Sequence, residues 1–413
     1  MQTQLADFIR DTREGQEADA ILRKCVHCGF CTATCPTYQL LGDELDGPRG
    51  RIYLIKQVLE GDEPTQRTQL HLDRCLTCRA CETTCPSGVE YGRLVDIGRH
   101  VVSQRVPRRG VDALMRWALK AFVPRARLFG AAMGAGRLVR GMLPAALKEK
   151  VPLARPAGHW PAPRHARRAI ALAGCVQPAM APSINAAAAR VLDTIGISLV
   201  EQPGAGCCGA LRQHLDDHEG ARADARRNID AWWPAIERGE IEAIVMTASG
   251  CGVQVRDYGH LLADDAAYAA RAARVAALTR DIGEVVAAEH DALVARLHAA
   301  PGSAGELAFH APCTLQHGQK LRGVVESVLT AAGFELLPVR DAHLCCGSAG
   351  TYSLLQPELS QRLRDDKLAA LTEHGALRIA SANIGCITHL DPASDVPVRH
   401  WIEYLDERLA AAA

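Results

Sequence analysis

Eight of the 16 cysteines form two runs of identical spacing in the first part of the chain. Each run reads C-x2-C-x2-C-x3-C-P, and the second lies 50 residues after the first: Cys25, Cys28, Cys31 and Cys35, then Cys75, Cys78, Cys81 and Cys85. This spacing is typical of bacterial-type [4Fe–4S] sites, in which three thiolates on a tight loop bind one cluster and the fourth reaches the other. The spacing therefore predicts two clusters, one held by Cys25, Cys28, Cys31 and Cys85 and the other by Cys75, Cys78, Cys81 and Cys35.

Structural zinc and disulfides explain these runs less well. Zinc needs only C-x2-C pairs and would leave the third and fourth cysteine of each run without a role. The N-terminal stretch is polar and no apolar run is long enough to cross a membrane, so we expect a cytoplasmic chain whose thiols stay reduced. His27 lies inside the first run, which is complete without it, so we expect it beside a cluster or at the surface.

The other eight cysteines show an internal duplication. They are Cys175, Cys207, Cys208 and Cys251, and then Cys313, Cys345, Cys346 and Cys386. The first three members of each set are 138 residues apart and the last two are 135 apart, which predicts two similar units, each with a Cys-Cys-Gly (CCG) sequence. Four converging thiols could bind a further cluster or another metal, form a redox dithiol, or simply pack as small apolar residues, and the spacing leaves these uses open.

Short apolar segments precede these cysteines and predict the strands that position them. The segments are 167–174, 196–202 and 242–249 in the first unit, and 305–311, 334–340 and 376–383 in the second. Helical composition between them, as in 183–193, indicates βαβ units with a parallel sheet. Each cysteine then follows the carboxyl end of a strand, the edge at which open α/β sheets place their sites.

A helix is predicted between the two N-terminal runs. Apolar residues recur at helical spacing across 48–60, and this insert resembles the helical two-cluster domain of respiratory iron–sulfur subunits more than a compact ferredoxin. Arg49 and Arg51 either bring positive charge to a cluster, which would raise its potential, or form only a solvated helix start.

The charge of the chain is unevenly distributed. Lys and Arg number 47, as do Asp and Glu, yet residues 101–168 hold 15 basic residues against Asp112 and Glu149, a net +13. We expect a connector of short amphipathic helices and extended linker that contacts anionic lipid or an acidic partner, or is merely solvated. Zero net charge and only 18 aromatic residues disfavour nucleic-acid binding.

No motif indicates an organic redox cofactor. Gly204–Gly209 formally fits G-x-G-x-x-G, but the corresponding stretch 342–347 keeps only the last glycine, so the duplication preserves CCG and not a dinucleotide fingerprint. We therefore expect no flavin or NAD on this chain, and hydride chemistry must take place elsewhere.

Two cysteine runs followed by two CCG units resemble the iron–sulfur subunits of membrane-associated dehydrogenases that pass electrons to quinone. The strings at 25–38, 75–99, 228–234 and 244–252 look most like those of glycolate oxidase iron–sulfur subunits. The resemblance implies a non-flavin electron-transfer subunit of a glycolate (2-hydroxy acid) oxidase, with no catalytic residue of its own. It also implies a flavin-containing dehydrogenase partner subunit, electron flow toward quinone, and attachment to the inner face of the cytoplasmic membrane.

Other members of the group keep alternatives open. The chain could be the iron–sulfur subunit of a lactate or glycerol-3-phosphate dehydrogenase. It could also be a heterodisulfide- or quinone-reductase that acts at the CCG thiols, or an interaction scaffold that is stabilised by bound metal and carries no electrons. Heterodisulfide-reductase CCG units end in C-x-x-C, but Gln254 and His389 stand at the last position here, which puts the non-cubane cluster of that family in doubt. His389 is either a replacement ligand or a residue beside the site.

The sequence thus predicts an α+β multidomain protein. A helical two-[4Fe–4S] ferredoxin domain is expected at 1–100 and the basic connector at 101–168. Two homologous α/β CCG domains with parallel sheets are expected at 169–300 and 301–413.

Overall fold

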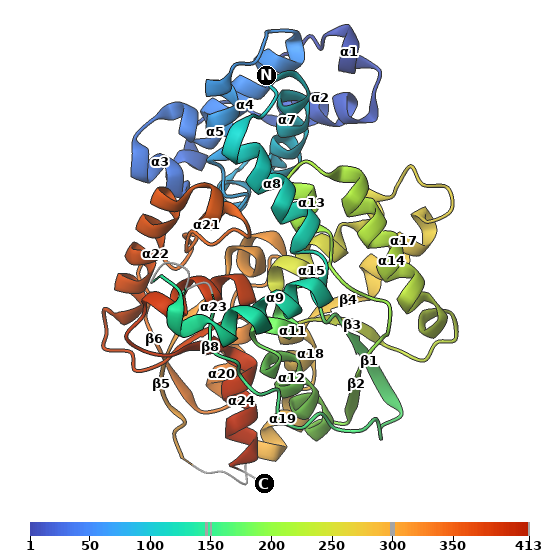
Figure 1. The fold of residues 1–413 in the computed structure, drawn as a ribbon, viewed down its shortest axis with the longest axis vertical. Coiled ribbons are helices and arrows are strands. Elements are labelled where there is room, and N and C mark those ends of the chain that lie inside the picture. The colour runs from blue at the N-terminus through green and yellow to red at the C-terminus, as the bar shows by residue number, and fades with distance from the viewer. Residues whose placement is uncertain (145–147, 149–150, 298–301, 412–413) are drawn as a thin grey trace.

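A computed structural model describes residues 1–144, 148, 151–297 and 302–411 of the chain. A helical body at the N-terminal end rests on two α/β units that lie side by side, and the two termini lie at opposite ends of the molecule (Figure 1). This arrangement of helices followed by two four-stranded parallel sheets confirms the predicted fold class.

The N-terminal body contains only helices and loops among its described elements. The helices are α1 (Asp7–Arg10), α2 (Arg13–Lys24), α3 (Pro36–Leu41), α4 (Pro48–Glu60), α5 (Gln66–Asp73), α6 (Ala80–Thr84) and α7 (Tyr91–Arg105). Helix α4 is the helix predicted at 48–60: Pro48 occupies its first turn, and Gly61 ends it at φ 113°, which favours glycine. Its apolar face, including Ile55 and Leu59, packs against α7.

The first α/β unit has the strand order β2-β1-β3-β4. Its strands are β1 (Arg167–Ala171), β2 (Ile197–Glu201), β3 (Ala243–Met246) and β4 (Thr279–Asp281). Its helices are α11 (Gln177–Met180), α12 (Ser183–Thr194), α13 (Ala210–His214), α14 (His218–Glu237), α15 (Ser249–Arg256), α16 (Tyr258–Leu261), α17 (Ala269–Leu278), α18 (Ile282–Ala288) and α19 (His290–Leu297). Ile170 in β1 lies opposite Val200 and Ile244, and all three pairings are parallel.

The second unit repeats this topology with the order β6-β5-β7-β8. Its strands are β5 (Gly305–His310), β6 (Phe334–Leu337), β7 (Ile379–Ser381) and β8 (Val398–His400). Its helices are α20 (Val324–Ala331), α21 (Tyr352–Leu355), α22 (Pro357–Thr372), α23 (Ile384–Leu390) and α24 (Trp401–Ala410), with a π-helical turn at Thr314–Gly318. All six predicted strands are present, and β4 and β8 are additional.

One apolar core joins the two units. Helix α12 packs on α24 and α18 packs on α20, so elements of each unit cover the other. Ile184, Val286, Val325 and Leu405 are all fully buried in this shared core. Because burial of a large aliphatic side chain contributes about 1.5–3 kcal/mol, the shared core fixes the two units against each other.

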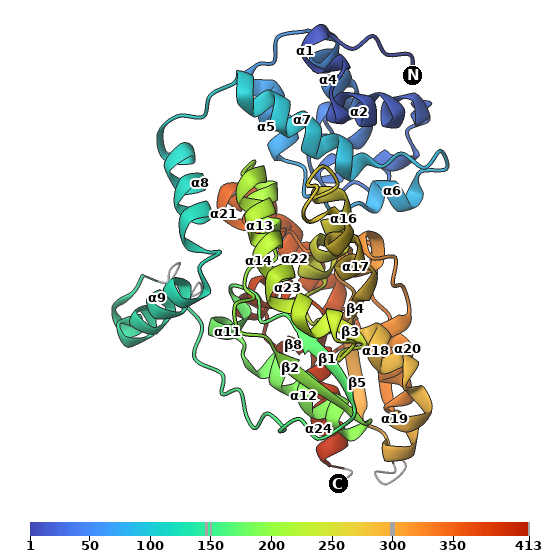
Figure 2. The same ribbon diagram turned by 90° about the vertical axis from the view of Figure 1, so that its right-hand side faces the viewer.

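The connector runs along one side of the molecule (Figure 2). It contains α8 (Gly110–Phe122) and α9 (Ala126–Leu138), and α8 has no buried residue. Trp117 is 64% exposed and Val111 is 75% exposed, although both are apolar. Within the described ranges, no helix is long and apolar enough to cross a membrane.

Candidate iron–sulfur centres and duplicated thiol sites

The two N-terminal cysteine runs adopt the same loop conformation. His27 and Gly29 in the first run have φ of 56° and 85°, and Thr77 and Arg79, 50 residues later, have φ of 50° and 60°. Left-handed residues at alternate positions are uncommon outside glycine and turn the chain tightly. Each loop therefore curls its thiols toward a common centre.

The first recess lies between the two loops. Its empty volume is about 430 Å³, which includes part of the adjoining solvent. Its lining includes Cys25, Cys28, Cys31 and Cys85, together with Cys81, His27 and Arg49. These thiols come from the end of α2, the following loop and the end of α6. The recess thus joins three thiols of the first run to the last thiol of the second run.

The second recess encloses about 300 Å³ and shows the reciprocal combination. Cys75, Cys78 and Cys81 of the second run meet Cys35 of the first run. Both sets named from the spacing are therefore brought together, each around its own space. Cys81 borders both recesses, so they are adjacent.

Burial opposes the ionisation of three of these thiols, those of Cys31, Cys78 and Cys81. Burial, aided by the neighbouring Cys25, raises the pKa of Cys31 to about 11. Burial likewise raises the pKa of Cys78, with Cys313 contributing, and that of Cys81, with Cys78 contributing. Thiols of this kind fit bound iron, because the positive charge of the metal stabilises the thiolates that ligate it.

Arg51 places a buried positive charge at the second recess. It is 1% exposed, its Nε donates to the His71 carbonyl at 2.7 Å, and its Nη2 lies 3.3 Å from Asp46 Oδ1. Burial opposes its charge, but Tyr91, Cys75, Cys35 and Asp46 hold its pKa above the ordinary value. A solvated helix start is therefore the wrong description of Arg51. Arg49 lines the first recess and pairs with Glu44 at 2.6 Å.

The CCG cysteines form one line of side-chain contacts in each unit. In the first unit Cys175 contacts Cys207, Cys207 contacts Cys208, and Cys208 contacts Cys251. In the second unit Cys313 Sγ lies 3.8 Å from Cys345 Sγ, Cys345 contacts Cys346, and Cys346 contacts Cys386. Every one of these thiols follows the carboxyl end of a strand, as expected from the sequence.

The thiol site of the second unit adjoins the second recess. Leu76, Cys78, Cys313, Cys345 and Tyr352 belong to one apolar cluster across the domain boundary. The Tyr352 hydroxyl donates to the Arg74 carbonyl at 3.2 Å, and Thr83 Oγ1 lies 2.9 Å from His317 Nδ1.

The first unit meets the N-terminal body through polar contacts. Arg93 pairs with Asp257 at 2.9 Å, and His100 pairs with Asp216 at 2.7 Å. The hydrogen bond to Asp216 raises the pKa of His100, which favours the charged form of the imidazole. Only the second unit's contact with the N-terminal body brings thiol beside thiol among the described side chains.

Asn383 links the two thiol sites across the interface between the units. Its Nδ2 donates to Cys386 Sγ at 3.5 Å, and its Oδ1 accepts from the Gly250 amide, next to Cys251, at 3.4 Å. Ser249 Oγ also lies 2.7 Å from Thr314 Oγ1, next to Cys313. The two sites are therefore neighbours.

One histidine near these sites was not expected from the sequence. His27 lines the first recess, beside the predicted cluster. His389 Nε2 lies 3.2 Å from Ser360 Oγ, which donates to the Gly347 carbonyl behind the CCG loop. The histidine that joins the second unit's thiols is instead His310, which the sequence analysis missed. Leu172 stands at the corresponding position of the first unit, 138 residues earlier, so the duplication gave no signal for this histidine.

Comparisons with known proteins match this architecture along the whole chain. A family described as "4Fe-4S dicluster domain" matches residues 21–89, and one described as "Cysteine-rich domain" matches residues 170–256 and 307–391. The chain is 54% identical over 412 residues, 99% of each chain, to the glycolate oxidase iron-sulfur subunit of Escherichia coli (strain K12). The chain belongs to the family of glycolate oxidase iron–sulfur subunits.

More distant relatives match most or part of the chain. The probable glycolate oxidase iron-sulfur subunit of Bacillus subtilis (strain 168) is 31% identical over 407 residues, covering 89% of this chain and 88% of its own length. Lactate utilization protein A of Exiguobacterium is 26% identical over 247 residues, which cover only 58% of this chain. Of these three relatives, the two glycolate oxidase subunits match a larger share of the chain.

Proposed function

We propose that this chain is the electron-transfer subunit of a glycolate oxidase. The observation that carries the proposal is the pair of adjacent recesses, each lined by three thiols of one run and the fourth thiol of the other. In this proposal Cys25, Cys28, Cys31 and Cys85 hold one [4Fe–4S] cluster, and Cys75, Cys78, Cys81 and Cys35 hold the second. Such clusters, when bound, accept and release single electrons.

The protein's own side chains set the conditions for that transfer. Tyr91, which is 3% exposed, borders both recesses. Its hydroxyl donates to Cys75 Sγ at 3.6 Å, and a hydrogen bond to a ligating sulfur raises the potential of a cluster. Arg51 adds a fixed positive charge beside the second recess and acts in the same direction.

Glycolate oxidation is assigned to a flavin on a partner subunit, and quinone is the proposed final acceptor. The thiol of Cys28 at the first recess is exposed to solvent, so this recess is the proposed entry for electrons. The second recess adjoins the second CCG unit and is the proposed exit. The chain alone is therefore expected to show no glycolate:dye activity.

Iron and sulfide counting with EPR tests this proposal. The anaerobically purified chain should contain about eight irons and give the signals of two reducible [4Fe–4S] clusters. A content of about twelve to sixteen irons would place clusters in the CCG units as well. Zinc at the N-terminal runs without iron would exclude electron transfer and overturn the proposal.

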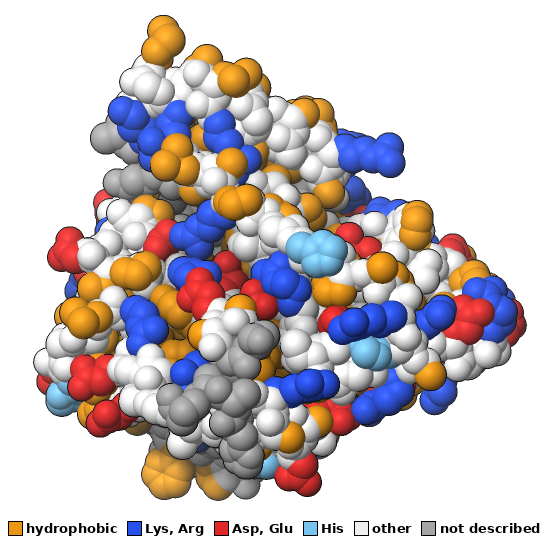
Figure 3. Space-filling model, turned by 90° about the horizontal axis from the view of Figure 1, so that it is seen from below, with side chains coloured by type: hydrophobic (Ala, Val, Ile, Leu, Met, Phe, Trp, Pro, Cys, Tyr) orange, Lys and Arg blue, Asp and Glu red, His pale blue; other side chains and the backbone are white. Residues whose placement is uncertain are grey.

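The connector is the proposed contact with the cytoplasmic membrane. Val111, Leu114 and Trp117 lie on α8 at helical spacing and are each at least 63% exposed, within a segment of net charge +13. Seen from below, the upper part of the view shows basic and apolar side chains without acidic ones, whereas basic and acidic side chains are intermixed over the rest of this face (Figure 3). An exposed apolar stripe among basic residues suits the surface of an anionic bilayer, where each Lys or Arg contributes about 1 kcal/mol.

Trp117→Glu is expected to weaken binding to vesicles that contain anionic phospholipid by roughly tenfold or more, because it removes an interfacial anchor and adds repulsion. Cosedimentation of the cluster-containing chain measures this. Leu377→Glu is the matched control, because Leu377 is 73% exposed but lies outside the connector. Equal binding by both variants would mean that α8 does not contact the membrane.

A further inference from the structure

Two imidazoles and one carboxylate meet where the N-terminal body contacts the first α/β unit. His100 lies in α7, Asp216 lies in the turn between α13 and α14, and His218 is the first residue of α14. His100 Nδ1 lies 2.7 Å from Asp216 Oδ1, and His218 Nε2 lies 3.3 Å from the same oxygen. One ligand atom of each residue lies within 4.8 Å of the other two. Two parts of the chain that fold separately thus contribute to one compact group.

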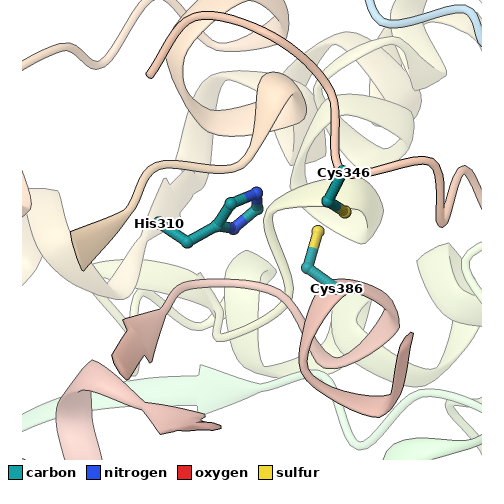
Figure 4. Close-up of side chains that lie close together, drawn as sticks. All are labelled: His310, Cys346 and Cys386. Atoms are coloured by element: carbon teal, nitrogen blue, oxygen red, sulfur yellow. The ribbon is translucent and has the colours of Figure 1, made fainter. Parts of the chain in front are cut away.

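The donors of this group are those that suit a divalent transition-metal ion. Imidazole nitrogen and carboxylate oxygen are both common zinc ligands, and a site with three protein ligands keeps one position for water. His310 instead faces the sulfurs of Cys346 and Cys386 (Figure 4). The group at the domain contact therefore differs in kind from the thiol sites, because its three side chains offer only nitrogen and oxygen.

The size of the group fits a single tetrahedral ion. Zinc binds imidazole nitrogen and carboxylate oxygen at about 2.0–2.2 Å, so tetrahedral geometry places neighbouring donors roughly 3.3–3.6 Å apart. The two nitrogens lie 2.7 Å and 3.3 Å from Asp216 Oδ1, so small side-chain rotations suffice to reach that separation. The ring centroids of His100 and His218 are 4.4 Å apart, which places both imidazoles beside the carboxylate.

Neighbouring residues hold these donors in place. Asp216 has φ of 62°, a left-handed conformation that is uncommon outside glycine and is concentrated at binding sites. Ser103 Oγ donates to Asp216 Oδ2, and the side-chain amide of Gln104 lies 2.8 Å from His100 Nε2. When the amide turns its oxygen to this nitrogen, Nε2–H donates to it and the Nδ1 lone pair is left for a metal.

We propose that His100, Asp216 and His218 bind one Zn²⁺ ion, with a water molecule as the fourth ligand. The side chains are 26%, 30% and 14% exposed, so the ion and its water reach them from solvent. The ion takes the place of the protons that join the imidazoles to the carboxylate, and these protons pass to water. It fastens α7 of the N-terminal body to the start of α14. The proposal does not rest on electron transfer, since none of the three residues borders a recess.

Anaerobic zinc titration of the full chain against a competing chelator tests the proposal. Because thiols elsewhere in the chain can also bind zinc, the wild type is compared with variants of this group alone. His218→Ala should lower the affinity for one zinc per chain at least roughly 100-fold, because even indirect partners of a ligand account for 10–100-fold. In the difference between the zinc X-ray absorption spectra, the lost zinc should have nitrogen and oxygen neighbours at about 2.0–2.2 Å and no sulfur.

Two further variants separate ligation from misfolding. Asp216→Gly removes the carboxylate but suits the left-handed backbone, so it should fold and still lose the same zinc. His290→Ala removes an exposed histidine of the same unit and should leave zinc binding unchanged. Zinc binding by a folded Asp216→Gly variant that equals that of the wild type would overturn the proposal. Sulfur neighbours around the zinc that His218→Ala loses would do the same.

Discussion

Asp46→Ala is expected to destabilise the N-terminal body by about 3–5 kcal/mol. Asp46 is fully buried and accepts from Arg51 at 3.3 Å, Arg74 at 2.8 Å and His71 at 3.1 Å. Its loss leaves the buried Arg51 guanidinium without its carboxylate, and a buried charge without its partner is costly. Anaerobic guanidinium titration, followed by the visible iron–sulfur absorption, should show a midpoint roughly 1 M lower.

The control is an ion pair of the same body that is exposed to water. Asp7 pairs with Arg10 at 2.8 Å, but its side chain is 91% exposed. Asp7→Ala should change the stability by less than about 1 kcal/mol, because water screens such pairs. If the midpoint of Asp46→Ala fell no further than that of Asp7→Ala, the buried network would not stabilise this body.

Replacing a single cluster cysteine is expected to remove one cluster and spare the other. Cys28→Ala and Cys85→Ala alter the first recess, whereas Cys78→Ala and Cys35→Ala alter the second. Each variant should fall from about eight irons to about four. The remaining EPR signal should be the same in the first two variants, and a different signal should be shared by the last two.

This design distinguishes crossed from uncrossed ligation, because Cys28 and Cys35 belong to one run but line different recesses. If Cys28→Ala and Cys35→Ala retained the same signal, each run would hold its own cluster and the crossed assignment would be wrong. Cys175→Ala, in the first CCG unit, is the control and should keep both signals.

The sequence predicted features that depend on local pattern. The helix at 48–60 appears as α4, since its apolar residues and its terminal Pro48 and Gly61 act within the segment itself. The six apolar strands appear for the same reason. Strands β4 and β8 were missed because each has three residues, and the sequences Thr-Arg-Asp and Val-Arg-His carry no apolar run.

Only those features of the site that depend on cysteine spacing were predictable from the sequence. Regular spacing indicated which thiols belong together, but the contacts between sites arise from packing of distant segments. Asn383 accepts a hydrogen bond from Gly250, which is 133 residues away in the sequence. Cys78 and Cys313 pack against the same apolar cluster although they come from different domains. His310 was missed because nothing in the sequence near it indicates a site. Only the folded chain places it beside Cys346 and Cys386.

We propose above all that this chain carries electrons derived from glycolate. The direct measurement is EPR of the complex purified anaerobically through a tag on this chain, before and after glycolate is added. We expect glycolate to reduce both [4Fe–4S] clusters in the complex, while the separated chain is reduced by dithionite but not by glycolate. Clusters that stay oxidised in a flavin-containing complex with glycolate, yet respond to dithionite, would contradict it.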